Sequence, residues 1–260
     1  MHIFILFLLF PLTHLYAMLI GNPGQPGLQQ DGLFYTPATW WSFRVSYFDD
    51  SIYRERFRDE FKINNEVRSR SAVRLTTFAT QLTLNFKDRI DLYGILGSSR
   101  IRVDKEIFTK RRLAWGLGTK FIIFRENRFF IGGDFKYFET DQKPTFFVVD
   151  GDPYNLQSDF RLNYHELQAA LGCTYSFPYV SPYINATYLL SKMEPQPRVA
   201  VVRLPDIDYA VDVTSKSVVG IKKWGMALGL TLVDISKASL ALEWRVFNQN
   251  AIDVNAEIRF

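Results

Sequence analysis

The chain has 260 residues, of which 47% are hydrophobic and 16% aromatic, with 23 Phe and 13 Tyr. A net charge of +4, with basic and acidic residues spread along the chain, does not indicate nucleic-acid binding. After the first residues, no run of about 18 uninterrupted apolar residues occurs, which excludes a bundle of membrane-spanning helices. The single cysteine, Cys173, excludes an intramolecular disulfide framework. Such an aromatic content suits a β-barrel, which places rings on its lipid-facing surface and at both membrane interfaces.

The first 17 residues have the pattern of a secretory signal peptide. The apolar run from Ile3 to Leu12 is too short to cross a bilayer as a helix, and Ala17 supplies a small residue at a cleavage point. Because the segment before this run lacks Lys and Arg, a buried strand or an uncleaved anchor stays open as an alternative. We expect 1–17 to be a signal peptide and 18–260 to be a single barrel domain.

Strict alternation of apolar and polar residues is the main structural signal, and it is clearest at the C-terminus. In 251–260, every second residue is apolar, and the residues between are charged or polar. A strand with one fully apolar and one fully charged face suits a wall with lipid outside and water inside. The same alternation recurs at 78–86, 115–123, 129–137, 165–175, 224–232 and 237–247.

Turn signals divide these strands and predict an all-β, antiparallel, up-and-down transmembrane β-barrel. Tight polar or Pro-bearing breaks are expected at 49–51, 87–89, 125–127, 177–178 and 234–236. Longer connections are expected at about 62–71, 98–111, 139–160 and 193–222. Short turns on the periplasmic side and long external loops are typical of bacterial barrels.

The strand count depends on two uncertain segments. If both termini are periplasmic, a strand at 30–36 is needed, and the chain then has twelve strands; a hairpin from 198–202 and 213–219 would make fourteen. In Tyr53–Lys62 the rings recur every four residues, a helical spacing, but the neighbouring segments require a strand. Read as a strand, this segment places Glu55 and Asp59 on the lipid face.

The ionisable residues of the alternating segments share one phase, and we expect that phase to face the lumen. A charge facing lipid would cost a few kcal/mol, whereas a wet interior accepts it. These residues would set the electric field and ion preference of a pore, or pair across strands and hold the wall together; both readings stay open. The predicted pore-lining residues are Arg44, Lys120, Asp134, Lys136, Glu166, Glu243, Arg245, Asp253, Glu257 and Arg259.

Catalytic chemistry is not expected. After removal of 1–17, His165 is the only histidine, and the phase of its strand points it toward lipid, near the interface. Cys173 shares that phase and is expected to be an inert lipid-facing residue, with an intermolecular disulfide as the alternative. No phosphate-binding loop, zinc spacing or calcium loop appears, so we predict neither cofactor nor metal.

Two further features concern the ends of the strands. Phe260 is a terminal aromatic that resembles the signal by which barrels are recognised for insertion by the assembly machinery; otherwise it is the last lipid-facing ring. The basic stretch Arg100–Arg112 is predicted in an external loop, where it would contact anionic lipopolysaccharide, attract anionic solutes or simply be solvated.

A series of short blocks, in the same order, resembles chlamydial major outer membrane proteins. Their order along most of the mature chain carries the resemblance more than any single block. This chain is considerably shorter than that family and lacks its many cysteines. The matching blocks are 21–26 (GNPGQP), 31–34 (DGLF), 42–48 (SFRVSYF), 91–97 (DLYGILG), 113–118 (LAWGLG), 164–171 (YHELQAAL), 181–184 (SPYI), 231–234 (TLVD) and 253–260 (DVNAEIRF).

The resemblance implies a porin of the bacterial outer membrane, usually a trimer, that passes small solutes and ions by size and charge. The alternative is a closed barrel, structural or adhesin-like, that acts through its external loops. The partners expected are outer-membrane lipids, the barrel-assembly machinery, small solutes and a homotrimer. Because this chain lacks the many cysteines of the family, we do not expect it to form a disulfide-linked envelope.

Overall fold

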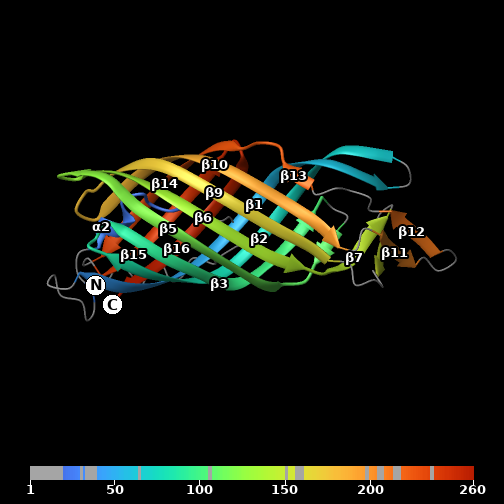
Figure 1. The fold of residues 1–260 in the computed structure, drawn as a ribbon, viewed down its shortest axis with the longest axis horizontal. Coiled ribbons are helices and arrows are strands. Elements are labelled where there is room, and N and C mark those ends of the chain that lie inside the picture. The colour runs from blue at the N-terminus through green and yellow to red at the C-terminus, as the bar shows by residue number, and fades with distance from the viewer. Residues whose placement is uncertain are drawn as a thin grey trace.

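The computed structural model shows a closed antiparallel β-barrel (Figure 1). It describes residues 20–29, 32, 40–63, 66–104, 107–149, 152–155, 161–196, 199–203, 208–212, 218–234 and 237–260. In this part of the chain, ten strands form the wall, each paired antiparallel with two neighbours. They are β1 (Trp41–Ile63), β2 (Glu66–Phe86), β3 (Ile90–Val103), β5 (Arg112–Glu126), β6 (Phe129–Gln142), β9 (Arg161–Tyr175), β10 (Val180–Gln196), β14 (Trp224–Asp234), β15 (Ala238–Val246) and β16 (Gln249–Arg259).

The first and last strands close the barrel. β1 pairs with β2 on one side and with β16 on the other, with Arg44 opposite Arg259. The main-chain N–H of Phe260 donates to the carbonyl of Phe43 at 2.8 Å, which extends this seam to the last residue. A closed wall leaves no strand edge in the bilayer, where an unpaired backbone group is costly.

The other described elements lie inside the wall or at its ends. The short helix α2 (Gln25–Leu28) and the C-terminus are at one end, which we call the terminal end (Figure 1). At the opposite, far end β13 (Val218–Gly220) pairs with β1 and β10, and β3 is extended by β4 (Ile107–Thr109), β7 (Pro144–Val149) and β8 (Asp152–Asn155). β11 (Val199–Arg203) and β12 (Asp208–Asp212) form a separate two-stranded sheet. No helix in the described residues is long and apolar enough to cross a membrane.

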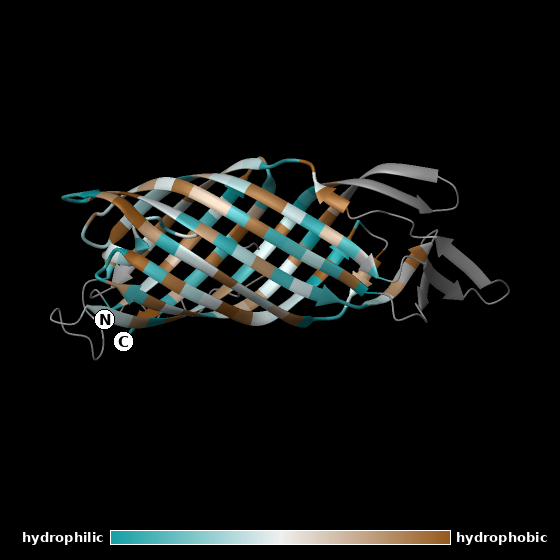
Figure 2. Ribbon diagram, viewed as in Figure 1, coloured by the Kyte–Doolittle hydropathy of each residue, from teal (hydrophilic) through white to brown (hydrophobic). Residues whose placement is uncertain are grey.

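Alternating hydropathy gives the wall its two faces, visible as brown and teal bands along the strands (Figure 2). In β15, Leu242 and Trp244 are 51% and 53% exposed, whereas Glu243 between them is fully buried. Successive side chains of a strand point to opposite faces, so the apolar set faces outward and the polar set inward. At the terminal end, Lys87, Asp88 and Asn127 adopt positive φ in the tight turns that were predicted there.

The predicted number of strands is wrong, although an even number is confirmed. The break expected at 49–51 lies inside β1, because Asp50 points inward and pairs with Arg245 on β15 and does not mark a turn. The connection expected at 62–71 is largely strand on both sides of 64–65. The strand expected at 30–36 falls outside the described residues except for Gly32. Val199–Arg203 does form a hairpin, but with Asp208–Asp212 and outside the wall.

Tyr53–Lys62 is part of β1, as predicted, but the orientation assigned to Glu55 is wrong. A register shift between Ile52 and Arg54 inserts an extra residue against β16. Such a bulge changes the phase of the strand that follows it. Glu55 and Phe57 therefore point inward and are 2% and 0% exposed. The side chain of Asp59 lies outside the described part.

Candidate functional site: the barrel interior

The inward phase brings together all ten charged side chains predicted from the sequence. Each is buried, with an exposed fraction between 0% and 7%. Whether they line a conducting path stays a prediction. The residues are Arg44, Lys120, Asp134, Lys136, Glu166, Glu243, Arg245, Asp253, Glu257 and Arg259.

Residues 20–29, which we call the plug, lie inside the wall at the terminal end. The main-chain N–H groups of Ile20 and Gly21 donate to the two carboxylate oxygens of Glu243 at 3.0 and 2.8 Å. The Gly21 carbonyl accepts from the amide of Asn185 at 3.0 Å. A chain segment without a strand partner must find hydrogen bonds elsewhere when it is buried, and inward polar side chains supply them here.

Asn22 is the most connected side chain of the plug. Its amide donates to the hydroxyl of Thr231 at 3.0 Å, and its oxygen accepts from the main chain of Gly24 at 2.8 Å and from Thr174. It is 1% exposed. These bonds tie the plug to β9 and β14, two strands that are not adjacent in the wall.

The helix α2 contacts the opposite side of the wall. Gln25 donates to Glu257 at 2.6 Å and accepts from Arg44 through its carbonyl at 3.0 Å. The carbonyl of Pro26 accepts from Asn85 at 3.1 Å. Leu28 packs with Ile122 and Phe130, which gives the plug a small apolar contact beside its polar ones. An added methyl group at Gly132 would overlap the carbonyl of Pro23, so the wall backbone also approaches the plug closely.

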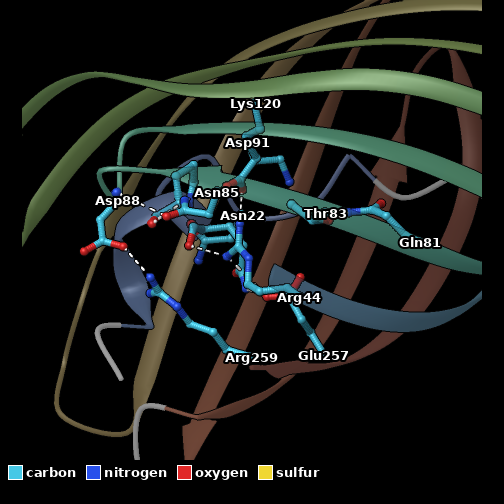
Figure 3. Close-up of polar contacts among 12 residues, drawn as sticks. Asn22, Arg44, Gln81, Thr83, Asn85, Asp88, Asp91, Lys120, Glu257 and Arg259 are labelled. Carbon is cyan, nitrogen blue, oxygen red and sulfur yellow. Dashed lines mark hydrogen bonds and ion pairs between the residues drawn. The ribbon is translucent and has the colours of Figure 1, made fainter. Parts of the chain in front are cut away.

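An ionic network underlies the plug at the β1–β16 seam (Figure 3). Arg44 pairs with Asp91, and with Glu257 at 3.4 Å. Arg259 reaches the turn residue Asp88 at 2.7 Å. Arg44, Asp91 and Glu257 are buried, so breaking one of their pairs would leave an uncompensated buried charge.

A second network lies on the inner face of three consecutive strands of the wall. Arg245 contacts Asp50 at 3.1 Å, Glu243 at 3.7 Å and Gln249 at 3.1 Å. Gln249 in turn donates to Glu55 at 3.2 Å. The network therefore links β1, β15 and β16 from the inside.

Two tyrosines extend the polar layer to the other strands. The hydroxyl of Tyr164 donates to Glu166 at 2.7 Å and lies 3.2 Å from one carboxylate oxygen of Glu55, and Ser191 donates to the other. Tyr93 donates to Asp134 at 2.7 Å, and Asp134 lies 3.5 Å from Lys120. A cavity of about 20 Å³ remains between these groups and the plug, which is room for about one water molecule.

An apolar layer fills the lumen toward the far end. Its members come from β1, β2, β3, β5, β6, β9, β10, β13 and β16. They meet across the barrel as the core of a soluble protein does, and we call them the cap. The cap residues are Ile52, Phe57, Val73, Leu75, Ile101, Val103, Ala114, Phe138, Leu162, Tyr164, Met193, Val218 and Ala251.

Sequence reasoning missed the plug, the cap and Glu55. The plug has no periodicity, and its only signal was a Gly- and Pro-rich composition that read as a mature N-terminus. The cap could have been noticed from inward apolar residues such as Val73, Leu75 and Ile101, which share the phase of the polar lumen-facing groups. Among the described residues, no group of His, Cys, Asp or Glu is arranged to hold a metal ion.

The three single positions singled out from the sequence lie on the outside or at the seam. His165 has the outward phase, 3.1 Å from the hydroxyl of Tyr137 and 3.8 Å from Glu139. Cys173 is also outward and lines an apolar depression on the outer surface. The ring of Phe260 lies beside that of Phe43, with 6.4 Å between the ring centroids. Its role as an insertion signal stays a prediction.

An apolar outer surface, a polar and apolar packed interior and a closed antiparallel wall define an outer-membrane β-barrel. The chain is similar over nearly its whole length to major outer membrane porins of Chlamydia trachomatis. It is 21% identical to the serovar F porin over 380 aligned positions and 22% identical to the serovar B porin over 377. Each alignment covers 95% of this chain and 96% of the relative. No protein-family profile matches the chain.

Two solved outer-membrane proteins show partial similarity to the barrel. The translocator domain of the autotransporter NalP from Neisseria meningitidis is 11% identical, with a TM-score of 0.47, and the comparison covers 91% of this chain and 94% of that domain. The outer membrane protease OmpT from Escherichia coli is 9% identical, with a TM-score of 0.42, covering 88% and 97%.

Proposed function

We propose that this protein is a closed outer-membrane barrel of the chlamydial porin type. Its function would be structural or adhesive, and its outer surface and far-end hairpins would make the contacts. The observation that carries the proposal is the cap, an apolar layer across the lumen. Barrels of eight strands have interiors just wide enough to be filled by side chains, whereas those of 16–18 strands leave an aqueous channel. A ten-stranded wall lies near the lower limit.

Passive diffusion of small solutes is the second candidate. It is favoured by the charged layer around Arg245 and by the name of the Chlamydia trachomatis relatives. In this conformation, the plug and the cap both stand in the path. Conduction would need both to move aside, and a charged lumen would then select ions.

Single-channel recording distinguishes the two functions. The full chain is refolded in detergent, shown to be heat-modifiable and β-rich, and added to a planar bilayer. A closed barrel gives no discrete conductance steps. Stable steps would overturn the closed barrel and establish the porin, and Lys136→Glu should then shift ion selectivity toward cations. Lys143→Glu, at an exposed position at the end of β6, makes the same charge change outside the lumen and is the matched control.

We further propose that the protein is not an enzyme. The support is that His165 lies on the outer face, with Tyr137 and Glu139 as neighbours, and not in the lumen. A hydrolase of the serine–histidine type needs its histidine beside a nucleophile in a shared site. We also propose that the barrel-assembly machinery recognises Phe260 during insertion and that the protein assembles as a homotrimer. Deletion of Phe260 and chemical cross-linking in native membranes test them.

A further inference from the structure

Six arginines gather on the outer surface of β1, β2 and β3 toward the far end. Their inward neighbours settle the orientation: Val73 and Leu75, on either side of Arg74, are 0% and 2% exposed, and Ile101, between the two arginines of β3, is 0% exposed. We call this surface the arginine face. It consists of Arg54 and Arg56 from β1, Arg74 from β2, Arg100 and Arg102 from β3, and Arg111 just before β5.

Strand register places these guanidinium groups side by side. Arg74 is directly opposite Arg102, and Arg100 is opposite Thr76, the next outward residue of β2. Arg56 is opposite Ala72, two residues along β2 from Arg74. Like charges directly opposite each other destabilise a sheet, so wall stability does not account for this arrangement.

The arginine face lies at the edge of the apolar outer band. Arg54 follows Tyr53, an outward ring that is 38% exposed. The guanidinium of Arg111 lies 4.0 Å from the ring centroid of Phe78, on the outward side of β2. Outward rings mark the membrane interface, so the arginines beside them are at the level of lipid headgroups.

Two carboxylates lie near the arginine face. Asp49 is in electrostatic contact with Arg111, and Asp104 accepts from the main chain of Ala72 at 2.9 Å. Within the described part of the chain, Arg54, Arg56 and Arg74 make no ion pair.

The outward charges of β6, β9 and β10 are arranged differently. Arg161 pairs with Asp141 at 3.3 Å, and Lys192 pairs with Glu194. On these strands, Arg161 and Lys192 are thus each balanced by a neighbouring carboxylate.

We propose that the arginine face binds the phosphate groups of anionic lipid headgroups in the membrane surrounding the barrel. Guanidinium groups bind phosphate oxygens in pairs, with a geometry that an ammonium does not offer. Basic residues clustered beside a membrane-spanning segment attract anionic lipids. A phosphate bound beside Arg54, Arg56 and Arg74 would offset charges that no carboxylate pairs in the described part of the chain. The inference holds whether the barrel conducts or not, because it concerns only the outer surface.

The test measures binding of a bis-phosphorylated lipid A to the full chain in zwitterionic detergent, by native mass spectrometry and by titration. The variant R74Q/R100Q/R102Q should weaken binding about tenfold or more. R161Q/K192Q/K223Q removes the same charge elsewhere and should change the affinity less than about twofold. Equal losses in the two triple variants would overturn the site.

Two further measurements test whether the phosphate groups of the lipid are what the arginine face binds. Lipid A without its phosphates should bind wild type and variant alike; wild-type affinity that does not depend on the phosphates would overturn the proposal. Inorganic phosphate at millimolar concentration should not displace the lipid, and full displacement would assign the face to free phosphate instead. If the glutamine variant does not fold, R74K/R102K keeps the charge, and its weaker binding shows that guanidinium geometry matters.

Discussion

The two ends of the lumen contain different chemistry. At the far end, the cap consists of apolar side chains that belong to the wall strands themselves. At the terminal end, the plug is a separate chain segment held largely by hydrogen bonds to inward polar groups. The cap side chains belong to strands of the wall, whereas the hydrogen bonds of the plug can be exchanged for bonds to water. We therefore expect the terminal end to open more readily than the far end.

The largest expected effect is on the cap. Phe138→Ala removes a ring that is 0% exposed, and should lower the free energy of unfolding by about 3–5 kcal/mol. Urea unfolding in detergent, followed by tryptophan fluorescence, measures the loss. The control is Phe135→Ala on the same strand, where the ring is 47% exposed on the outer face. A similar loss in both variants would mean that the cap does not act as a core.

A smaller effect is expected from the best-connected residue of the plug. Asn22→Ala removes several buried hydrogen bonds and leaves Thr231 without its amide partner, at a cost of about 1–3 kcal/mol. The loss should appear as faster proteolysis and hydrogen exchange in 20–29, with the wall strands unchanged. Asn250→Ala, at an exposed position in β16, is the matched control. Loss of protection in the wall as well would contradict an independently opening plug.

A still smaller loss of plug stability is expected from Glu243→Gln. The carboxylate accepts from both Ile20 and Gly21, and a neutral amide keeps only one acceptor atom, so about 1–2 kcal/mol of plug stability should be lost. Exchange of these two amides should increase more than that of Gly27, whose main-chain N–H donates to Gly24 within the plug. Equal increases at all three would show that the plug leaves as one unit.

The smallest effect is expected outside both layers. His165→Ala removes only contacts at the outer surface, with Tyr137 and Glu139, and should change the free energy of unfolding by about 0.5 kcal/mol or less. The same urea titration measures it. A loss as large as that of Phe138→Ala would place His165 in a structural role that its outward position does not suggest.

Local periodicity was sufficient to predict a closed antiparallel wall, though not its number of strands, and the inward orientation of all ten charged residues, since each strand shows its phase within its own sequence. It could not reveal that β1 continues through Asp50, because that depends on Arg245, nearly 200 positions away in the chain. It also could not locate the bulge that turns Glu55 inward. The plug was missed for a related reason: Asn22 and Gln25 are ordered by side chains of distant strands and by no pattern of their own.

The seam between β1 and β16 has a consequence for how the barrel is made. Residues 20–29 come before β1 in the chain, yet they end up enclosed by a wall that is complete only when Arg259 meets Arg44. Two orders of assembly satisfy this geometry: the wall closes around residues 20–29, or these residues enter the closed wall through the terminal end. In the first order, residues 20–29 act as a template around which β16 is joined to β1.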